Sequence, residues 1–179
     1  GRNQTLKAVD GVNFKIYKGE TLGIVGESGC GKTTCGKTVM GLYKATGGEV
    51  LFDGVDINKL NKNEKKEFTK RAQIIFQDPS ACLNPRRTIK QILMEPFEIH
   101  NLKDKIDVDA KIMELLQLVG LDSYHLSRYP HELSGGMRQR AALIRTMALK
   151  PDILLLDEPF SALDYQTRLT VCDDIYEII

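Results

Sequence analysis

The feature that most constrains this chain is the glycine-rich segment at residues 26–33, which reads Gly-Glu-Ser-Gly-Cys-Gly-Lys-Thr. It fits the pattern Gly-x-x-x-x-Gly-Lys-[Ser/Thr], in which successive backbone N–H groups turn toward one centre and form a nest for an anion. A short apolar run at residues 22–25 precedes the segment, and a stretch of helical character begins at Lys32. A chance glycine-rich turn would not need this strand–loop–helix context. We therefore interpret the segment as a nucleotide-phosphate site.

The residue types in this loop suit phosphate chemistry. The Lys32 ammonium would reach the β- and γ-phosphates, and the Thr33 hydroxyl would bind Mg²⁺. The helix that starts near Lys32 would add the positive end of its dipole. The nucleotide-binding residues that we expect here are Gly26, Glu27, Ser28, Gly29, Cys30, Gly31, Lys32, Thr33 and Thr34.

Two carboxylates follow a second apolar run near the end of the sequence. Residues 153–156 read Ile-Leu-Leu-Leu, and Asp157 and Glu158 come directly after them. In open parallel sheets, ligands bind at the carboxyl ends of buried strands. Asp157 would hold Mg²⁺, directly or through water, and Glu158 would orient or deprotonate the attacking water. The alternative is that Asp157 and Glu158 are only polar residues at the end of a strand. This interpretation is less favoured because the chain also contains a phosphate loop.

The segment Leu133-Ser134-Gly135-Gly136 precedes a helical stripe and has two interpretations. Ser134 is a good N-cap for that helix. The serine and the two glycines also form a candidate second anion site at a helix N-terminus. One nucleotide does not need two phosphate sites in one chain, so we expect a partner chain that uses one site from each subunit in a two-fold arrangement.

The pattern along the chain indicates an α/β core with a helical insertion. Apolar residues alternate early in the chain, an Asp53-Gly54 pair suits a hairpin turn, and the middle of the sequence has a helical period. The expected strands cover residues 12–17, 22–25, 49–52, 55–57, 72–76 and 153–156; the expected helices lie at 32–42, from 59 onward, and within 88–150.

Charge and composition exclude several classes of protein. The 179 residues contain 25 Lys and Arg against 24 Asp and Glu, a net charge of +1, which argues against a dedicated nucleic-acid binder. No apolar run approaches the ~20 residues that a membrane-spanning helix needs. The four cysteines form no Cys-x-x-Cys pair and are interpreted as reduced thiols. The first residues hold no initiator Met and the last lie within a periodic stretch, so we expect a fragment cut at both ends.

Taken together, these segments resemble the nucleotide-binding subunit of an ABC transporter over essentially the whole chain. The resemblance includes a Walker A motif (26–33), a Q-loop at Gln77, a signature (133–137), a Walker B motif (153–158) and a D-loop (161–164). The sequence of residues 77–86 and 128–136 is similar to that of the oligopeptide/dipeptide importer ATPases.

The resemblance implies a fold and a domain plan. The fold is α/β, a P-loop NTPase (RecA-like) core with an N-terminal antiparallel β-subdomain and an inserted α-helical subdomain. Residues 1–179 would form a single ABC ATPase domain, truncated at both ends. Residues 1–78 and 151–179 would supply the core with its β-subdomain, and residues 79–150 the helical subdomain.

The resemblance also implies a function: two subunits bind ATP head to tail, between Walker A of one and the signature of the other, and hydrolysis powers the import of peptides or similar small solutes. Gln77 would sense the γ-phosphate, Mg²⁺ or water. The implied site comprises catalytic Glu158, Lys32 and Gln77, the signature contacts Ser134, Gly135 and Gly136, and the metal ligands Thr33, Gln77 and Asp157. The implied partners are a second ATPase subunit, identical or related, transmembrane permease subunits and, indirectly, a solute-binding protein, with no nucleic acid. The implied location is peripheral, at the cytoplasmic face of the cell membrane.

Three departures from the family pattern matter. Position 137 is Met where Gln is usual, no aromatic residue precedes Phe14, so that the ring that stacks on adenine is expected before Gly1, and the switch His would lie beyond Ile179. We therefore expect residues 1–179 alone to be poorly stable and to hydrolyse ATP negligibly. Two alternatives stay open: a soluble ABC ATPase acting outside transport, and a partner subunit that binds ATP without hydrolysing it.

Overall fold

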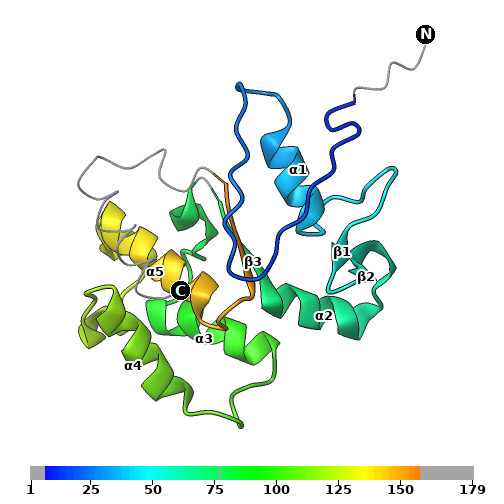
Figure 1. Ribbon diagram of the computed structural model, residues 1–179. Coiled ribbons are helices and arrows are strands. Elements are labelled where there is room, and N and C mark those ends of the chain that lie inside the picture. Colours follow the sequence, from blue (N-terminus) through cyan, green and yellow to red (C-terminus); the bar gives the residue numbers. More distant parts are fainter. Residues whose placement is uncertain (1–6, 77, 158–179) are drawn as a thin grey trace. The chain divides into compact units, whose positions relative to one another are not determined.

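The computed structural model in Figure 1 describes residues 7–76 and 78–157, and the chain divides into two units. The first unit is Gly1–Leu60 and the second is Asn61–Ile179. Each unit has its own internal packing and carries its own share of the motifs. Within the described residues, no helix is both long enough and apolar enough to cross a membrane.

The described residues of the first unit form helix α1, a hairpin and a short 3₁₀ turn, η1 (Ile57–Lys59). Helix α1 is Lys32–Val39, and strands β1 (Leu51–Phe52) and β2 (Val55–Asp56) pair antiparallel. The turn between them has φ of 49° at Asp53 and 80° at Gly54. Two successive positive φ angles are what a two-residue hairpin of the Asp-Gly type requires. The hairpin predicted from Asp53-Gly54 is therefore confirmed.

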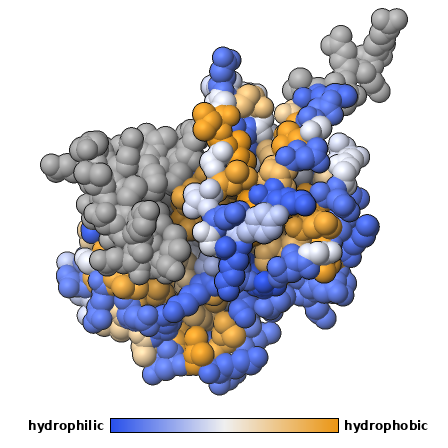
Figure 2. Space-filling view, viewed as in Figure 1, coloured by the Kyte–Doolittle hydropathy of each residue, from blue (hydrophilic) through white to orange (hydrophobic). Residues whose placement is uncertain are grey.

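Two strands predicted in this unit are not formed. Residues 12–17 and 22–25 have no strand assignment, although their apolar patterns favour one. Their apolar side chains stay at the surface, up to 95% exposed at Val25, and Figure 2 shows apolar side chains at the surface of this part of the chain. A strand needs ladder hydrogen bonds from a neighbour, and neither segment has such a neighbour among the described residues. The apolar pattern indicates that these segments could form strands, but a strand forms only where a neighbouring strand supplies hydrogen bonds.

The second unit begins with a helix that runs directly into a strand. Helix α2 is Lys62–Arg71, and its N-terminus is a capping box between Asn61 and Glu64. Strand β3 (Ala72–Ile75) follows at once and pairs in parallel with β4 (Ile153–Leu156). The register sets Ala72 opposite Ile153 and Ile75 opposite Leu156. An ion pair of 2.5 Å between Arg71 and Asp152 fixes the start of both strands.

Three helices connect β3 to β4 and form the main apolar core. They are α3 (Ile89–Ile99), α4 (Val108–Leu118) and α5 (Gly135–Met147). Each begins after a residue whose side chain accepts a backbone N–H of the first turn: Thr88, Asp107 and Ser134. Short 3₁₀ turns at Pro79–Cys82 (η2), Ser123–Ser127 (η3) and Pro130–Glu132 (η4) join them. The predicted helical character of 88–150 is confirmed.

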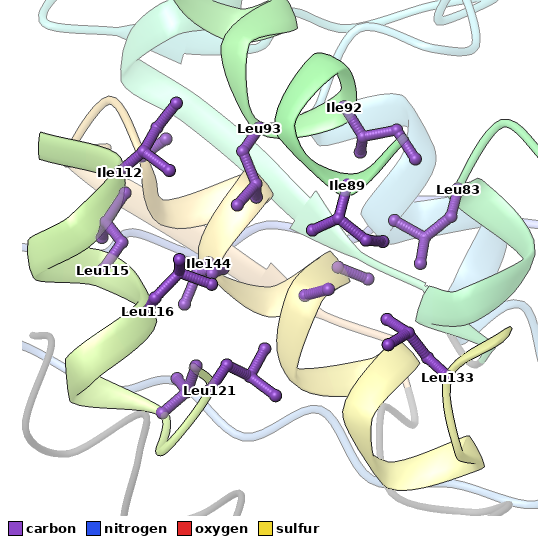
Figure 3. Close-up of a cluster of buried hydrophobic side chains, with 14 of the residues drawn as sticks. Leu83, Ile89, Ile92, Leu93, Ile112, Leu115, Leu116, Leu121, Leu133 and Ile144 are labelled. Atoms are coloured by element: carbon purple, nitrogen blue, oxygen red, sulfur yellow. The ribbon is translucent and has the colours of Figure 1, made fainter. Parts of the chain in front are cut away.

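The core of this unit consists mainly of apolar side chains from all three helices, and Figure 3 shows many of them pointing toward one another. The most deeply buried are Phe97, Ile89, Ile92, Leu93, Ile112, Leu116, Ile144 and Val119. Burying one such side chain contributes about 1.5–3 kcal/mol, so this cluster dominates the stability of the unit. Beside it, Glu95 on α3 accepts from Arg87 at 3.3 Å and from Arg145 on α5 at 2.8 Å.

Candidate functional site

The glycine-rich loop of the first unit depends on glycine conformations. Gly29 has φ of 81° and Gly31 has φ of 98°, both in the left-handed region that disfavours other residues. A Cβ at Gly31 would also lie 2.3 Å from the carbonyl oxygen of Ala8. Position 31 therefore accepts only glycine, for reasons of both conformation and space. This geometry is typical of a loop whose backbone N–H groups converge on an anion.

The side chain of Lys32 turns back over the same loop. Its Nζ atom donates to the carbonyl oxygens of Gly26 at 2.7 Å and Glu27 at 2.8 Å. The Sγ atom of Cys30 lies 3.9 Å from the same nitrogen. A Cβ at Gly26 would approach that Sγ to 2.6 Å, so a side chain at this position would require the Cys30 side chain to move. The ammonium therefore lies at the centre of the loop, and its role as a phosphate ligand stays a prediction.

The loop leads straight into the N-terminus of α1. Gly31 is the N-cap residue and supplies no side-chain cap to the first turn, which contains Lys32, Thr33 and Thr34. The first N–H groups of a helix have no acceptor within the helix, and a phosphate group satisfies them well. The ammonium, the glycine loop and the helix start thus form one cradle that fits a polyphosphate. Glu27, Ser28 and Cys30 lie exposed on this loop.

In the second unit, Ser134 occupies the N-cap of α5. Its Oγ accepts the N–H of Met137 at 3.3 Å, so the capping role predicted for Ser134 is confirmed. Gly135 and Gly136 form the first turn of the helix, and Leu133 anchors the segment because its side chain is 4% exposed. A helix start with two glycines leaves its backbone accessible to an anion, and the second phosphate site stays a prediction.

The ends of β3 and β4 lie at one edge of their sheet. The N–H of Asp157 donates to the carbonyl oxygen of Ile75 at 3.0 Å, which extends the ladder one residue beyond β4. Phe76 and Asp157 are therefore level in the parallel register. Ligands bind at this carboxyl edge in open parallel sheets, so the position of Asp157 suits a metal ligand. Gln77, Glu158 and the predicted D-loop at 161–164 lie outside the described residues.

The structure thus brings the predicted residues together in two groups. Residues 26–34 share one cradle in the first unit. In the second unit, Asp157 lies at the sheet edge and residues 134–136 lie at the start of α5. Asp78 and Arg138 stand beside these motifs, although neither residue belongs to the site predicted from the sequence. Asp78 and Ser80 match a common capping pattern, from which the turn after β3 could have been predicted.

Asp78 is held as an anion by its surroundings. Its pKa is lowered from the ordinary 3.8, first by the hydrogen bond from the Ser80 hydroxyl and then by the backbone N–H groups of Ala81 and Ser80, while partial burial opposes the shift. The positive charge of Arg138 on α5 adds to the lowering. Hydrogen bonds to a carboxylate and a nearby cation both favour its charged form.

Comparison with protein families gives one consistent answer. The family model described as ABC transporter matches residues 9–161. The oligopeptide transport ATP-binding protein OppF of Bacillus subtilis (strain 168) is 50% identical over 177 residues, 97% of this chain and 58% of the relative. The dipeptide transport ATP-binding protein DppF of Lactococcus lactis subsp. cremoris is 47% identical over 181 residues, 99% of this chain and 58% of the relative. The chain spans about half the length of the curated relatives it matches.

Solved structures agree with the family match. The dimeric structure of MJ0796, a bacterial ABC transporter cassette, has a TM-score of 0.79 and 30% identity, and covers 96% of this chain and 74% of that one. The same cassette in a post-hydrolysis state, bound to ADP and Pi, has a TM-score of 0.75 and 31% identity, with the same coverage. The fold predicted from the sequence is therefore confirmed.

Proposed function

Because the chain belongs to the ABC transporter family, we propose that it is the ATP-binding and ATP-hydrolysing subunit of a peptide importer. The observation that carries ATP binding is the cradle at residues 26–34, where the Lys32 ammonium lies among loop carbonyls at the start of α1. Peptide import is supported by identities of 47–50% to ATP-binding proteins of oligopeptide and dipeptide transport.

In this proposal Lys32 exchanges its two loop carbonyls for the β- and γ-phosphate oxygens of ATP. The exchange is favourable because a charge-assisted contact to phosphate is stronger than one to a neutral carbonyl. The glycines at 26, 29 and 31 keep the backbone close enough to bind the phosphates directly. Phosphoryl transfer is catalysed mainly by positioning and charge stabilisation, which such a rigid cradle provides.

The Thr33 hydroxyl, the Asp157 carboxylate and Gln77 are the proposed ligands of Mg²⁺. Hard oxygen donors of this kind suit Mg²⁺, which usually keeps further phosphate and water ligands. When bound, the ion neutralises charge that develops on the phosphates. Glu158 accepts the proton of, or orients, the attacking water, and this role stands with that of Gln77 as a prediction from the sequence.

The segment Ser134-Gly135-Gly136 binds the ATP held by a second subunit, identical or related, in a head-to-tail dimer. Two observations support this role: the exposed N-terminus of α5 and the dimeric state of the similar cassette MJ0796. ATP then favours the closed dimer because it contacts both subunits. The further partners are the permease and, through it, a solute-binding protein. The proposed location of the subunit is the cytoplasmic face of the cell membrane. The division into a core (1–78 and 151–179) and a helical subdomain (79–150) belongs to the same proposal.

The test is ATP-dependent uptake of a labelled peptide by the transporter reconstituted in vesicles. We expect uptake and phosphate release with the unaltered subunit, and loss of both with Lys32→Ala. Glu158→Gln should abolish phosphate release but leave nucleotide binding, because it removes only the water-directing carboxylate. Lys15→Ala, a change of the same type at an exposed lysine outside the loop, is the matched control and should leave both rates unchanged.

Other results would redirect the assignment. Tight nucleotide binding without turnover in the assembled transporter would assign the chain to a hydrolysis-deficient partner subunit. Failure to co-purify with any membrane permease, together with ATP turnover, would favour a soluble ABC ATPase.

A further inference from the structure

Helix α2 carries its lysines on the face that is turned away from the core. Phe68 is 6% exposed and marks the buried side of the helix. Lys62, Lys66 and Lys70 follow one another at four-residue spacing, which places side chains on one face of a helix. At about 100° of rotation per residue, Lys66 points about 160° away from Phe68. The three residues therefore form a lysine row on the outer face of α2.

The acidic side chains of α2 offset little of this charge. Half of the ten residues of the helix are Lys or Arg, and two are Glu. Glu64 accepts the N–H of the N-cap residue at 2.8 Å, so its carboxylate belongs to the capping box. Glu67 lies 3.7 Å from the ammonium of Lys70, an exposed contact of small energy. Within the described part of the chain, Lys62 and Lys66 make no ion pair.

The positive field of the lysine row extends beyond its own helix. His100 follows the last residue of α3, and burial lowers the pKa of its ring. The charges of Lys66 and Lys70 lower this pKa further. The opposing field of Glu67 is weaker than that of either lysine. The face of the molecule around the lysine row is therefore positive, although an acidic residue lies between two of its members.

The shape of the lysine row limits the kind of partner that it fits. Eight residues rise about 12 Å along a helix, so the three ammonium groups lie along a line on a convex surface. A convex line of cations cannot enclose a small anion, but it can rest against a flat anionic surface. Lysine carries its charge on a flexible stem that adapts to mobile headgroups, whereas recognition of nucleic acid favours the rigid fork of arginine. The anionic surface of a lipid bilayer fits these properties.

We propose that the lysine row of α2 binds anionic lipid headgroups, which gives the subunit a direct electrostatic contact with the membrane beside its contact with the permease. The inference goes beyond the proposed function and takes from it only the location at the membrane face. No member of the lysine row belongs to the nucleotide site. Each ammonium adds to the attraction, which decays within about one Debye length of the surface, roughly 10 Å at 0.1 M salt.

The experiment measures how the full-length subunit, without the permease, sediments with lipid vesicles. One set of vesicles is pure phosphatidylcholine, and the other is an equimolar mixture of phosphatidylcholine and phosphatidylglycerol. We expect the partition coefficient to be about tenfold or more higher for the mixed vesicles, and to fall about tenfold or more between about 0.1 M and about 1 M salt. Lys66→Gln should lower it about fivefold, and the triple change of the lysine row to Gln about a hundredfold.

Three further variants test whether charge at this particular face is responsible. Lys66→Arg keeps the charge and should keep the partition coefficient within about twofold. Glu67→Gln removes the opposing charge and should raise it about twofold or more. Lys90→Gln is the matched control, because it removes one positive charge from an exposed lysine that pairs with Asp109 at 2.7 Å and lies outside α2. We expect it to change the partition coefficient less than about twofold. Circular dichroism checks that each variant stays folded.

Several results would overturn the inference. Equal sedimentation with both kinds of vesicle would exclude recognition of anionic headgroups. Equal losses in Lys66→Gln and Lys90→Gln would show that only the net charge matters. Binding to duplex DNA but not to mixed vesicles would assign the lysine row to a nucleic acid, and vesicle binding that requires the permease would assign it to an acidic protein segment.

Failure of the inference can be told apart from failure of the proposed function. If the reconstituted transporter imports no peptide but Lys66→Gln weakens vesicle binding as expected, only the proposed function fails. If the transporter imports peptide and the changes in the lysine row leave vesicle binding unaltered, only this inference fails.

Discussion

The two units of this chain support their functional segments in contrasting ways. In the second unit, the start of α5 rests on a core of apolar side chains that are almost completely buried. In the first unit, Met40 and Ile57 are the buried large apolar side chains among the described residues, and the apolar residues at 12–17 and 22–25 are exposed. The phosphate cradle nevertheless has a definite shape in this unit.

The contrast shows that a loop and a helix terminus obtain their geometry from different sources. The cradle is shaped by glycine conformations and by hydrogen bonds between residues within six positions of one another, such as those of Lys32. The α5 start has a local cap at Ser134, but it is held in place by packing between helices that are far apart in sequence. Substitutions in the core of the second unit should therefore change mainly the free energy of unfolding. Substitutions in the cradle of the first unit should change mainly the affinity for the ligand.

The largest expected effect is on the core of the second unit. Phe97→Ala removes a side chain that is 1% exposed and should lower the free energy of unfolding by about 3–5 kcal/mol. Val25→Ala, at a side chain that is 95% exposed in the first unit, should change it by less than about 0.5 kcal/mol. Urea denaturation followed by circular dichroism measures both. Equal losses of unfolding free energy in the two variants would show that the two units do not differ in this way.

The next effect concerns the cradle. Gly31→Ala forces a Cβ to within 2.3 Å of the Ala8 carbonyl oxygen and a side chain into φ of 98°. Strain of this kind costs about 1–3 kcal/mol, so we expect ATP affinity to fall by about tenfold or more. Gly47→Ala is the matched control, because a Cβ there meets nothing within 4 Å. Fluorescence titration with a nucleotide analogue checks both, and unaltered affinity in Gly31→Ala would contradict the geometry of the loop.

A smaller effect separates capping from ligand binding at α5. Ser134→Ala removes a side-chain cap and should destabilise the protein by about 1 kcal/mol. Thr88→Ala removes the corresponding cap of α3 and should cost a similar amount, also about 1 kcal/mol. Only the first variant should weaken ATP-dependent dimer formation. If both variants weaken it equally, Ser134 acts through helix stability alone.

The smallest effect is a pH dependence within the second unit. The pKa of His100 is lowered from the ordinary 6.5, first by burial and then by the charges of Lys66 and Lys70 on α2, against a weaker opposing field from Glu67. The native state therefore resists protonation more than the unfolded state does. Stability is fully present above pH 6.5 and declines as pH falls below that value toward the lower native pKa.

His100→Gln should abolish this decline, which we expect to be less than about 1 kcal/mol because solvent screens the partly exposed ring. Unfolding by urea at pH 7.5 and pH 5.0 in both proteins measures the difference. NMR titration of the His100 ring gives the direction independently, and a pKa above 6.5 would reverse the predicted sign. Lys66→Met should move the pKa upward, toward its ordinary value.

Sequence reasoning succeeded wherever a signal was local. The Asp53-Gly54 hairpin, the Ser134 cap and the helical period within residues 88–150 each depend on residues within a few positions, and the structure has all three. It failed at residues 12–17 and 22–25, where alternation or apolar character was taken for a strand. Those patterns indicate which side chains of a strand could be buried, but burial also requires a neighbouring element that covers them.

By itself, the sequence determined the chemistry of the phosphate loop, because glycine, lysine and threonine at fixed spacing admit few backbone shapes and few ligands. Only the tertiary structure decided that β3 pairs with β4, joined at their start by Arg71 and Asp152, which are 81 residues apart. It likewise packed α5 against η2, two elements that lie far apart in the sequence. Local hydrogen bonds depend on near neighbours, whereas contacts across such separations depend on how every intervening element packs.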